Sequence, residues 1–138
     1  MKIKQLLITV TFAVLSSNVY AGLTQPAEVT VDLVNRTAQG DMHTARTSDS
    51  DFTMIGCGIR KIATSPTETI SFGFCQANSG ETEDGSFTCF TQNADILAGI
   101  DAISDYSFVS FSWDENDECV RIGNSTQSFY LPNIKEKK

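Results

Sequence analysis

The sequence predicts an α+β protein: a small, mostly antiparallel sheet of about six strands with one helix, stapled by disulfides. Most of the chain alternates apolar and polar residues, a single stretch has helical spacing, and there are four cysteines, an even number. The 138 residues, 41% hydrophobic and 20% charged, suit one ordinary domain. No internal repeat or linker divides the chain.

Six segments are expected to form strands because β-branched residues, aromatic residues or period-two alternation mark each of them. They span 28–34, 52–63, 68–77, 86–91, 106–113 and 118–123. A turn containing Pro66 is expected to join the second and third strands into a hairpin with one cysteine on each arm. The acidic turn 114–117 joins the last two into a second hairpin.

Polar stretches separate these strands. Residues 35–51 are expected to form a loop, with a short helix inside it as an alternative, and residues 78–85 an exposed connection. The single expected helix begins at Asn93, a capping residue, and runs to about Ser104, with apolar residues on one face. The aromatic strand 106–113 is expected to pack in the core, and a last extended piece is expected at 127–131.

The N-terminal residues have the three parts of a signal peptide. Two lysines precede the apolar run 6–15, and Val19 and Ala21 stand at the −3 and −1 positions of a cleavage site before Gly22. The run is too short to span a hydrocarbon core of about 30 Å, so no membrane span is expected after cleavage. We therefore expect a signal peptide at 1–21 and a single exported α+β domain at 22–138, in the periplasm or outside the cell.

Export affects the interpretation of the cysteines, because disulfides form in oxidising compartments. Cys57, Cys75, Cys89 and Cys119 are expected to form two disulfides. There is no C-x-x-C motif and only one histidine, so neither a zinc site nor thioredoxin-type chemistry is expected. Three pairings are possible. We favour Cys75 with Cys89, which would close the polar loop between them, and Cys57 with Cys119, which would tie an early strand to a late one.

Charge excludes one class of partner. The formal net charge is −7, removal of the signal peptide would take away two further lysines, and no segment is rich in Lys or Arg. An acidic chain repels phosphate backbones, so no nucleic acid partner is expected.

The acidic turn at 114–117 is not expected to begin an EF-hand, because Cys119 stands where the motif has glycine at position six and Ser125 where it has glutamate at position twelve. A looser calcium site there, or at Asp49 and Asp51, remains an alternative.

His43 and Arg46 are the candidate binding residues, because they lie in the long polar stretch that contains the only histidine. A hydrolase would use His43 as a base with a serine such as Ser48 and an acid such as Asp41, but there is no G-x-S-x-G motif. No catalytic residue, metal or cofactor is therefore expected.

Arg46 and Arg60 lie beside apolar or cysteine-bearing segments. Each is expected to pair with a carboxylate inside the fold rather than with an acidic group of a ligand.

Several segments together resemble a group of small, uncharacterised exported bacterial proteins with a four-cysteine frame. They are Gly40-Asp41-Met42-His43-Thr44-Ala45-Arg46, Ile55-Gly56-Cys57, the other three cysteines and the region 102–114 around Trp113. The resemblance implies one exported, disulfide-framed domain. It brings no activity, ligand or catalytic residue.

These observations favour a non-enzymatic exported interaction or accessory protein, a class that includes inhibitor-like proteins. Its expected partner is an unknown protein or a component of the cell envelope, to which it would present loops and an acidic face. Two alternatives stay open: a small secreted hydrolase centred on His43, and a calcium-stabilised extracellular binding module.

Overall fold

The computed structural model describes residues 23–82 and 85–132, so the predicted signal peptide lies outside the described residues. Seven strands form two antiparallel sheets, one with the order β1-β2-β6-β7 and one with the order β3-β4-β5. The mostly antiparallel architecture with one helix of two turns and two disulfides is confirmed, but the expected single sheet of six strands is wrong. The strands are β1 (Thr30–Asp32), β2 (Thr37–Asp41), β3 (Met54–Ser65), β4 (Glu68–Asn78), β5 (Ser86–Thr91), β6 (Phe108–Trp113) and β7 (Cys119–Ser125). The helices are α1 (Met42–Arg46), α2 (Ala94–Asp101) and a 3₁₀ turn, η2 (Ser128–Tyr130).

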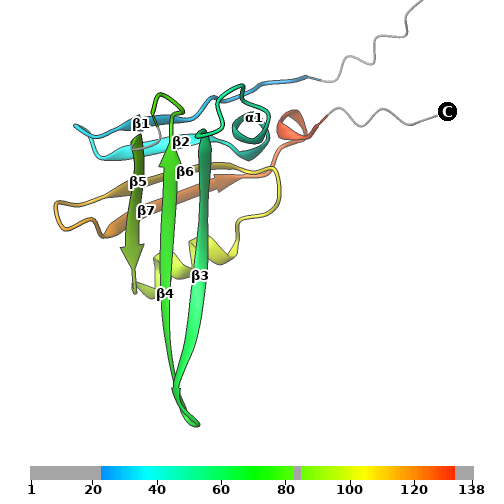
Figure 1. Cartoon of the computed structure of the whole chain (residues 1–138). Coiled ribbons are helices and arrows are strands. Elements are labelled where there is room, and N and C mark those ends of the chain that lie inside the picture. The colour runs from blue at the N-terminus through cyan, green and yellow to red at the C-terminus, as the bar shows by residue number, and fades with distance from the viewer. Residues whose placement is uncertain (1–22, 83–84, 133–138) are drawn as a thin grey trace, which may run out of the picture.

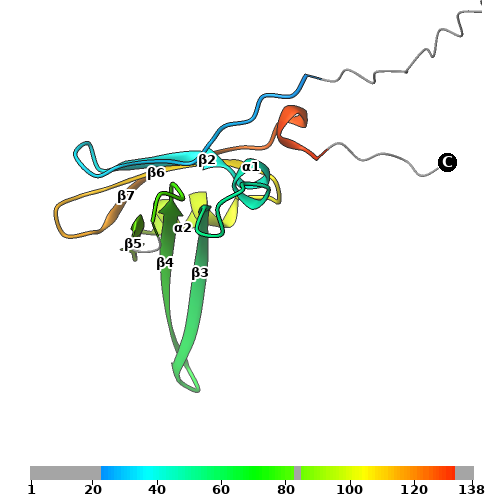
Figure 2. The same cartoon turned by 45° about the horizontal axis from the view of Figure 1, so that its top comes forward.

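The two sheets face each other with their strands crossing steeply (Figures 1 and 2). The core between them combines alternate residues of β6 with small residues and cysteines of the three-stranded sheet. Phe111 is fully buried, and Trp113 stacks on Phe87 of β5 with ring centroids 3.8 Å apart. The expectation that the aromatic strand packs in the core is therefore confirmed.

The expected loop at 35–51 is wrong where it contains the strand β2, whereas the short helix considered there is present as α1. β2 lies between β1 and β6, and its buried residues are Ala38, Gly40 and Asp41, of which two are small and one is polar. At Gly40 a side chain would lie 2.8 Å from the Cα atom of Val29, so the N-terminal segment passes too closely for anything larger. Small buried residues give little hydropathy signal, which explains the error. The extended piece expected at 127–131 is also wrong, since it contains η2.

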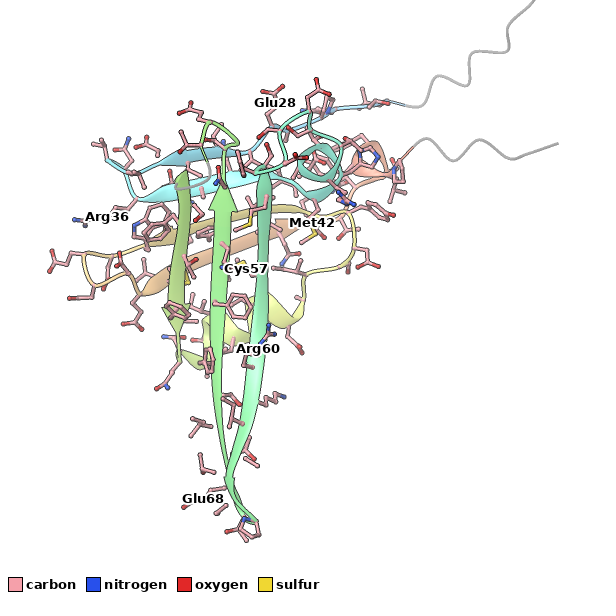
Figure 3. All side chains as sticks on the ribbon, viewed as in Figure 1. Glu28, Arg36, Met42, Cys57, Arg60 and Glu68 are labelled. Carbon is pink, nitrogen blue, oxygen red and sulfur yellow. A yellow bond between two sulfur atoms is a disulfide. The ribbon has the colours of Figure 1, made fainter. Side chains whose placement is uncertain are left out.

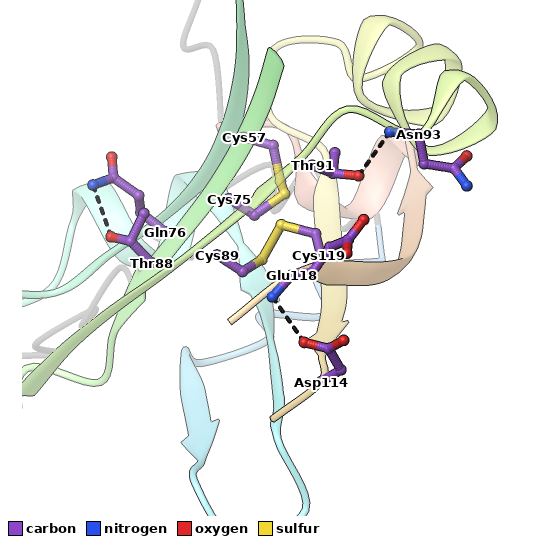
Figure 4. Close-up of a disulfide and its surroundings, with 10 residues drawn as sticks. All are labelled: Cys57, Cys75, Gln76, Thr88, Cys89, Thr91, Asn93, Asp114, Glu118 and Cys119. Carbon is purple, nitrogen blue, oxygen red and sulfur yellow. Dashed lines mark hydrogen bonds between the residues drawn. A yellow bond between two sulfur atoms is a disulfide. The ribbon is translucent and has the colours of Figure 1, made fainter. Parts of the chain in front are cut away.

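The β3–β4 hairpin is confirmed, but the favoured cysteine pairing is wrong. The disulfides join Cys57 to Cys75 and Cys89 to Cys119. Cys57 and Cys75 are directly opposite each other in the hairpin, with Cα atoms 4.0 Å apart. The second disulfide joins β5 to β7 and so links the two sheets covalently (Figure 4).

Helix α2 fills one end of the space between the sheets. The Asn93 side chain caps it by accepting hydrogen bonds from two backbone amides, as expected, but the helix ends at Asp101, before the expected Ser104. Ile100 packs over Gly73 of β4, and Gly99 approaches Ile122 of β7. Among the described residues, no helix has the length and apolar character needed to cross a bilayer.

Candidate functional site

His43 lines a hollow of about 200 Å³ where three segments meet. The N-terminal segment, α1 and η2 supply its walls, which consist of Thr24, Pro26, Asp41, His43, Thr44, Thr47, Phe129, Tyr130 and Leu131. The His43 ring is partly buried, with its centroid 6.1 Å from that of Tyr106. The hollow is small and combines apolar side chains with hydroxyl groups.

The acid in this hollow is engaged in holding the backbone. Asp41 is only 1% exposed, and its two carboxylate oxygens accept hydrogen bonds from the amides of Ala27 at 2.6 Å and Thr44 at 2.7 Å. The second bond caps α1, and the first fixes the N-terminal segment. Asp41 is therefore a structural residue, and its oxygens are occupied by backbone amides.

Replacing Asp41 by Ala is expected to lower the free energy of unfolding by about 1–3 kcal/mol, because two amides lose a charged acceptor in a buried place. Urea unfolding followed by Trp113 fluorescence measures this. The control is Asp49→Ala, which removes an exposed carboxylate from the following segment. Equal stability of the two variants would contradict a structural role for Asp41.

The other residues proposed for a hydrolase do not join His43. Ser48 does not line the hollow, and its hydroxyl hydrogen-bonds to that of Thr53 at 3.0 Å. Arg46, at the end of α1, is exposed and also lies outside the lining. Of the two candidate binding residues, only His43 lines the described hollow, and no serine lines it.

The acidic turn at 114–117 closes on itself. The Asp114 carboxylate accepts hydrogen bonds from the amides of Glu118 at 3.0 Å and Asn116 at 2.8 Å. These bonds, that from Glu118 first, lower the pKa of Asp114 below its ordinary value. The carboxylate thus already stabilises its own hairpin turn.

The three-stranded sheet has a second face that points away from the core. Because side chains alternate along strands, the cysteines of β4 and β5 face inward and the intervening residues face outward. We call this side the outer face. Ile62, Ile70 and Phe90 are about half exposed on it, at 48%, 47% and 53%. Its residues are Met54, Arg60, Ile62, Ile70, Phe72, Phe74, Gln76, Thr88 and Phe90.

The hairpin β3–β4 extends well past β5. β5 pairs only with the part of β4 from Gly73 to Asn78, whereas β3 and β4 pair as far as Ser65 and Glu68. Residues 60–72, which we call the arm, therefore form a two-stranded ribbon that projects from the body (Figure 1). Ile62 and Ile70 are opposite each other on the arm and continue the outer face outward.

Arg60 lies where the arm leaves the body (Figure 3). Its guanidinium carbon is 4.9 Å from the centroid of the Phe74 ring, which packs in turn over Gly58. Arg60 is exposed, and among the described residues neither it nor Arg46 forms an ion pair, so the expected pairing inside the fold is not found in this part of the chain. The outer face thus presents a guanidinium, held by an aromatic ring, among apolar side chains.

A second hollow, of about 240 Å³, lies beside Phe74. Its lining residues are Met54, Ile55, Gly56, Cys57, Phe74 and Gln76. The apolar part of the outer face was missed by sequence reasoning, which treated the hairpin as ordinary sheet. Isoleucines at matching distances from Pro66 were the available signal, because such positions face each other across a hairpin.

Comparison with protein-family models, curated proteins and solved structures finds no match for this chain.

Proposed function

We propose that this chain is an exported, non-enzymatic interaction protein that binds a partner protein through the outer face and the arm. The observation that carries the proposal is the row of exposed apolar side chains that runs from the body onto the arm around Arg60. Exposed apolar surface of this kind is typical of protein interaction sites. A two-stranded ribbon is marginally stable alone, so a partner that covers the arm would also stabilise it.

The charge on the outer face indicates the chemistry of the partner. Arg60 is the only charged residue on this face of β3, β4 and β5 between Met54 and Phe90, apart from Glu68 at the tip of the arm. A guanidinium has several donors in a planar fork and is well suited to a carboxylate. We therefore propose that the partner presents a segment with a carboxylate between apolar side chains.

Export is supported by the two disulfides, which persist mainly in oxidising compartments, and by the lysine-led apolar segment at the N-terminus. Binding rather than catalysis is supported by the hollow beside His43. Its carboxylate is bonded to backbone amides, and the candidate serine lies outside it.

The test uses a photo-cross-linking residue at position 62 of the oxidised protein, incubated with periplasmic and secreted fractions of the source cell. The matched control carries the same residue at Val120, which is 52% exposed but lies on β7. We expect one partner protein to be captured at position 62 and not at position 120. Equal capture at both positions, or none at position 62, would overturn the proposal.

The contribution of Arg60 to binding is measured with the purified partner. Arg60→Glu is expected to weaken binding at least tenfold, because a charge-assisted contact becomes a repulsion. The control is Arg121→Glu, which reverses an exposed charge on β7. Unchanged affinity for Arg60→Glu, or cross-linking at position 62 to a second copy of this chain, would show that the partner class is wrong.

A further inference from the structure

Three of the four cysteines form a row across the three-stranded sheet. Cys75 on β4 is directly opposite Cys57 on β3 and also directly opposite Cys89 on β5. It is bonded to Cys57, whereas Cys89 is bonded to Cys119 of the other sheet. Figure 4 shows the two disulfides side by side. Cys75 therefore has a second cysteine in a position equivalent to that of its present partner.

The sulfur atoms of Cys75, Cys89 and Cys119 all lie within 4.8 Å of one another. The sulfur of Cys75 is thus adjacent to a disulfide to which it does not belong. Thiol–disulfide exchange requires a thiolate to reach a disulfide sulfur, and here the fold already holds them together. A bridge between Cys75 and Cys89 would join directly opposite residues of paired strands, as the bridge between Cys57 and Cys75 already does.

The four cysteines differ in access. Cys75, Cys89 and Cys119 are at most 1% exposed, whereas Cys57, on the edge strand β3, is partly exposed. A thiolate from outside would therefore reach the sulfur of Cys57 before the other three. Attack at that atom releases the sulfur of Cys75, which is the one that touches the second disulfide.

We propose that these cysteines form a thiol–disulfide exchange relay that is opened by an external dithiol. A thiolate of the dithiol attacks Cys57 Sγ, and Cys75 leaves as a thiolate. The second thiolate of the dithiol then resolves the mixed disulfide, so the dithiol is oxidised and Cys57 is left as a thiol. Cys75 attacks Cys89 Sγ; the Cys75–Cys89 bond forms, the Cys89–Cys119 bond breaks, and the Cys119 sulfur takes up a proton.

The net reaction consumes one dithiol and converts two disulfides into one disulfide and two thiols. The surviving bridge joins β4 to β5, and the covalent link between the two sheets is lost. Reduction at the accessible Cys57 thereby removes the bridge at the buried Cys119, and β7 is then held by its pairing with β6 and by non-covalent packing. The relay depends on the cysteines alone and is independent of the partner proposed above.

Two single variants test the relay, because each removes the same disulfide and leaves one partner of it as a free thiol. In Cys57→Ser the remaining thiol is Cys75, beside the second disulfide, whereas in Cys75→Ser it is Cys57. After incubation at pH 8, acid quenching, alkylation in denaturant and peptide mapping, we expect Cys57→Ser to contain molecules labelled at Cys119 and bridged between Cys75 and Cys89. Cys75→Ser should be labelled at Cys57 alone. Label only at Cys75 in the first variant, or at Cys89, would overturn the proposed route.

The unaltered chain provides a second measurement that does not depend on the folding of the variants. The oxidised protein is treated with one equivalent of dithiothreitol, quenched in acid at successive times and mapped in the same way. The relay predicts that Cys57 and Cys119 are the first pair of thiols to accumulate. Accumulation of Cys57 and Cys75 with an intact Cys89–Cys119 bridge would contradict it.

Discussion

Phe111→Ala is expected to lower the free energy of unfolding by about 3–5 kcal/mol, the range for an aromatic side chain removed from a packed core. Phe111 is fully buried on β6 and points into the space between the two sheets, with its ring 5.9 Å from that of Trp113. Its removal leaves a cavity among strands and disulfides that cannot collapse easily. Urea unfolding followed by the fluorescence of Trp113, the only tryptophan, measures the loss.

The matched control is Phe90→Ala, which removes the same side chain from the outer face, where it is 53% exposed. We expect its effect on unfolding to be well below that of Phe111→Ala, because most of the ring remains in contact with water in the folded chain. Similar losses for the two variants would show that Phe90 is covered or that Phe111 is not a core residue. Phe90→Ala also bears on the proposed function, since it should weaken partner binding.

Joint replacement of Cys89 and Cys119 by Ala is expected to lower the free energy of unfolding by about 3–4 kcal/mol. This disulfide closes a loop with a sequence separation of 30 and is the cross-link between the two sheets. Without it the unfolded chain gains conformational entropy, and only non-covalent packing holds β5 against β7. Thermal and urea unfolding under oxidising conditions measure the change.

The comparison variant lacks both Cys57 and Cys75. That disulfide has a sequence separation of only 18 and joins two strands that a tight turn already brings together. We therefore expect the smaller loss for this variant. The opposite order would indicate that the hairpin, rather than the contact between the sheets, limits stability.

Local patterns predicted much of the fold. The turn at Pro66, the run of β5 from Ser86 to Thr91, the cap at Asn93 and the hairpin of β6 and β7 all depend on residues a few positions apart. Such features are encoded by alternation, capping side chains and turn residues. The pairing of Cys57 with Cys75 was also predictable, because each lies nine residues from Pro66 and the two therefore face each other across the hairpin.

Other features require contacts between distant segments. β2 was missed because Gly40 must be small where Val29 crosses over it, a constraint that appears only once the N-terminal segment is in place. The pairing of Cys89 with Cys119 depends on β5 meeting β7, where Phe90 forms a parallel bridge with Glu118. No local pattern records either contact.

The candidate sites show the same division. The sequence drew attention to His43 and Arg60. The hydrogen bond from the distant Ala27 amide to Asp41 changed the interpretation of His43, and the end of the β4–β5 pairing at Gly73 changed that of Arg60. An apolar residue such as Ile62 is expected in the core of a sheet when its strand is considered alone. Ile62 is exposed because β5 does not extend along the arm.

The positions of most strands and of helix α2, the number of disulfides and the burial of the aromatic strand could thus be predicted from the amino-acid sequence, because interactions between near neighbours dominate their free energies. The division of seven strands into two sheets, the link between those sheets and the exposed arm could not. They result from packing between segments that are far apart in the chain. Which segments pack together depends on how well their surfaces fit and on how much apolar area they bury, and neither can be read from a short stretch of sequence.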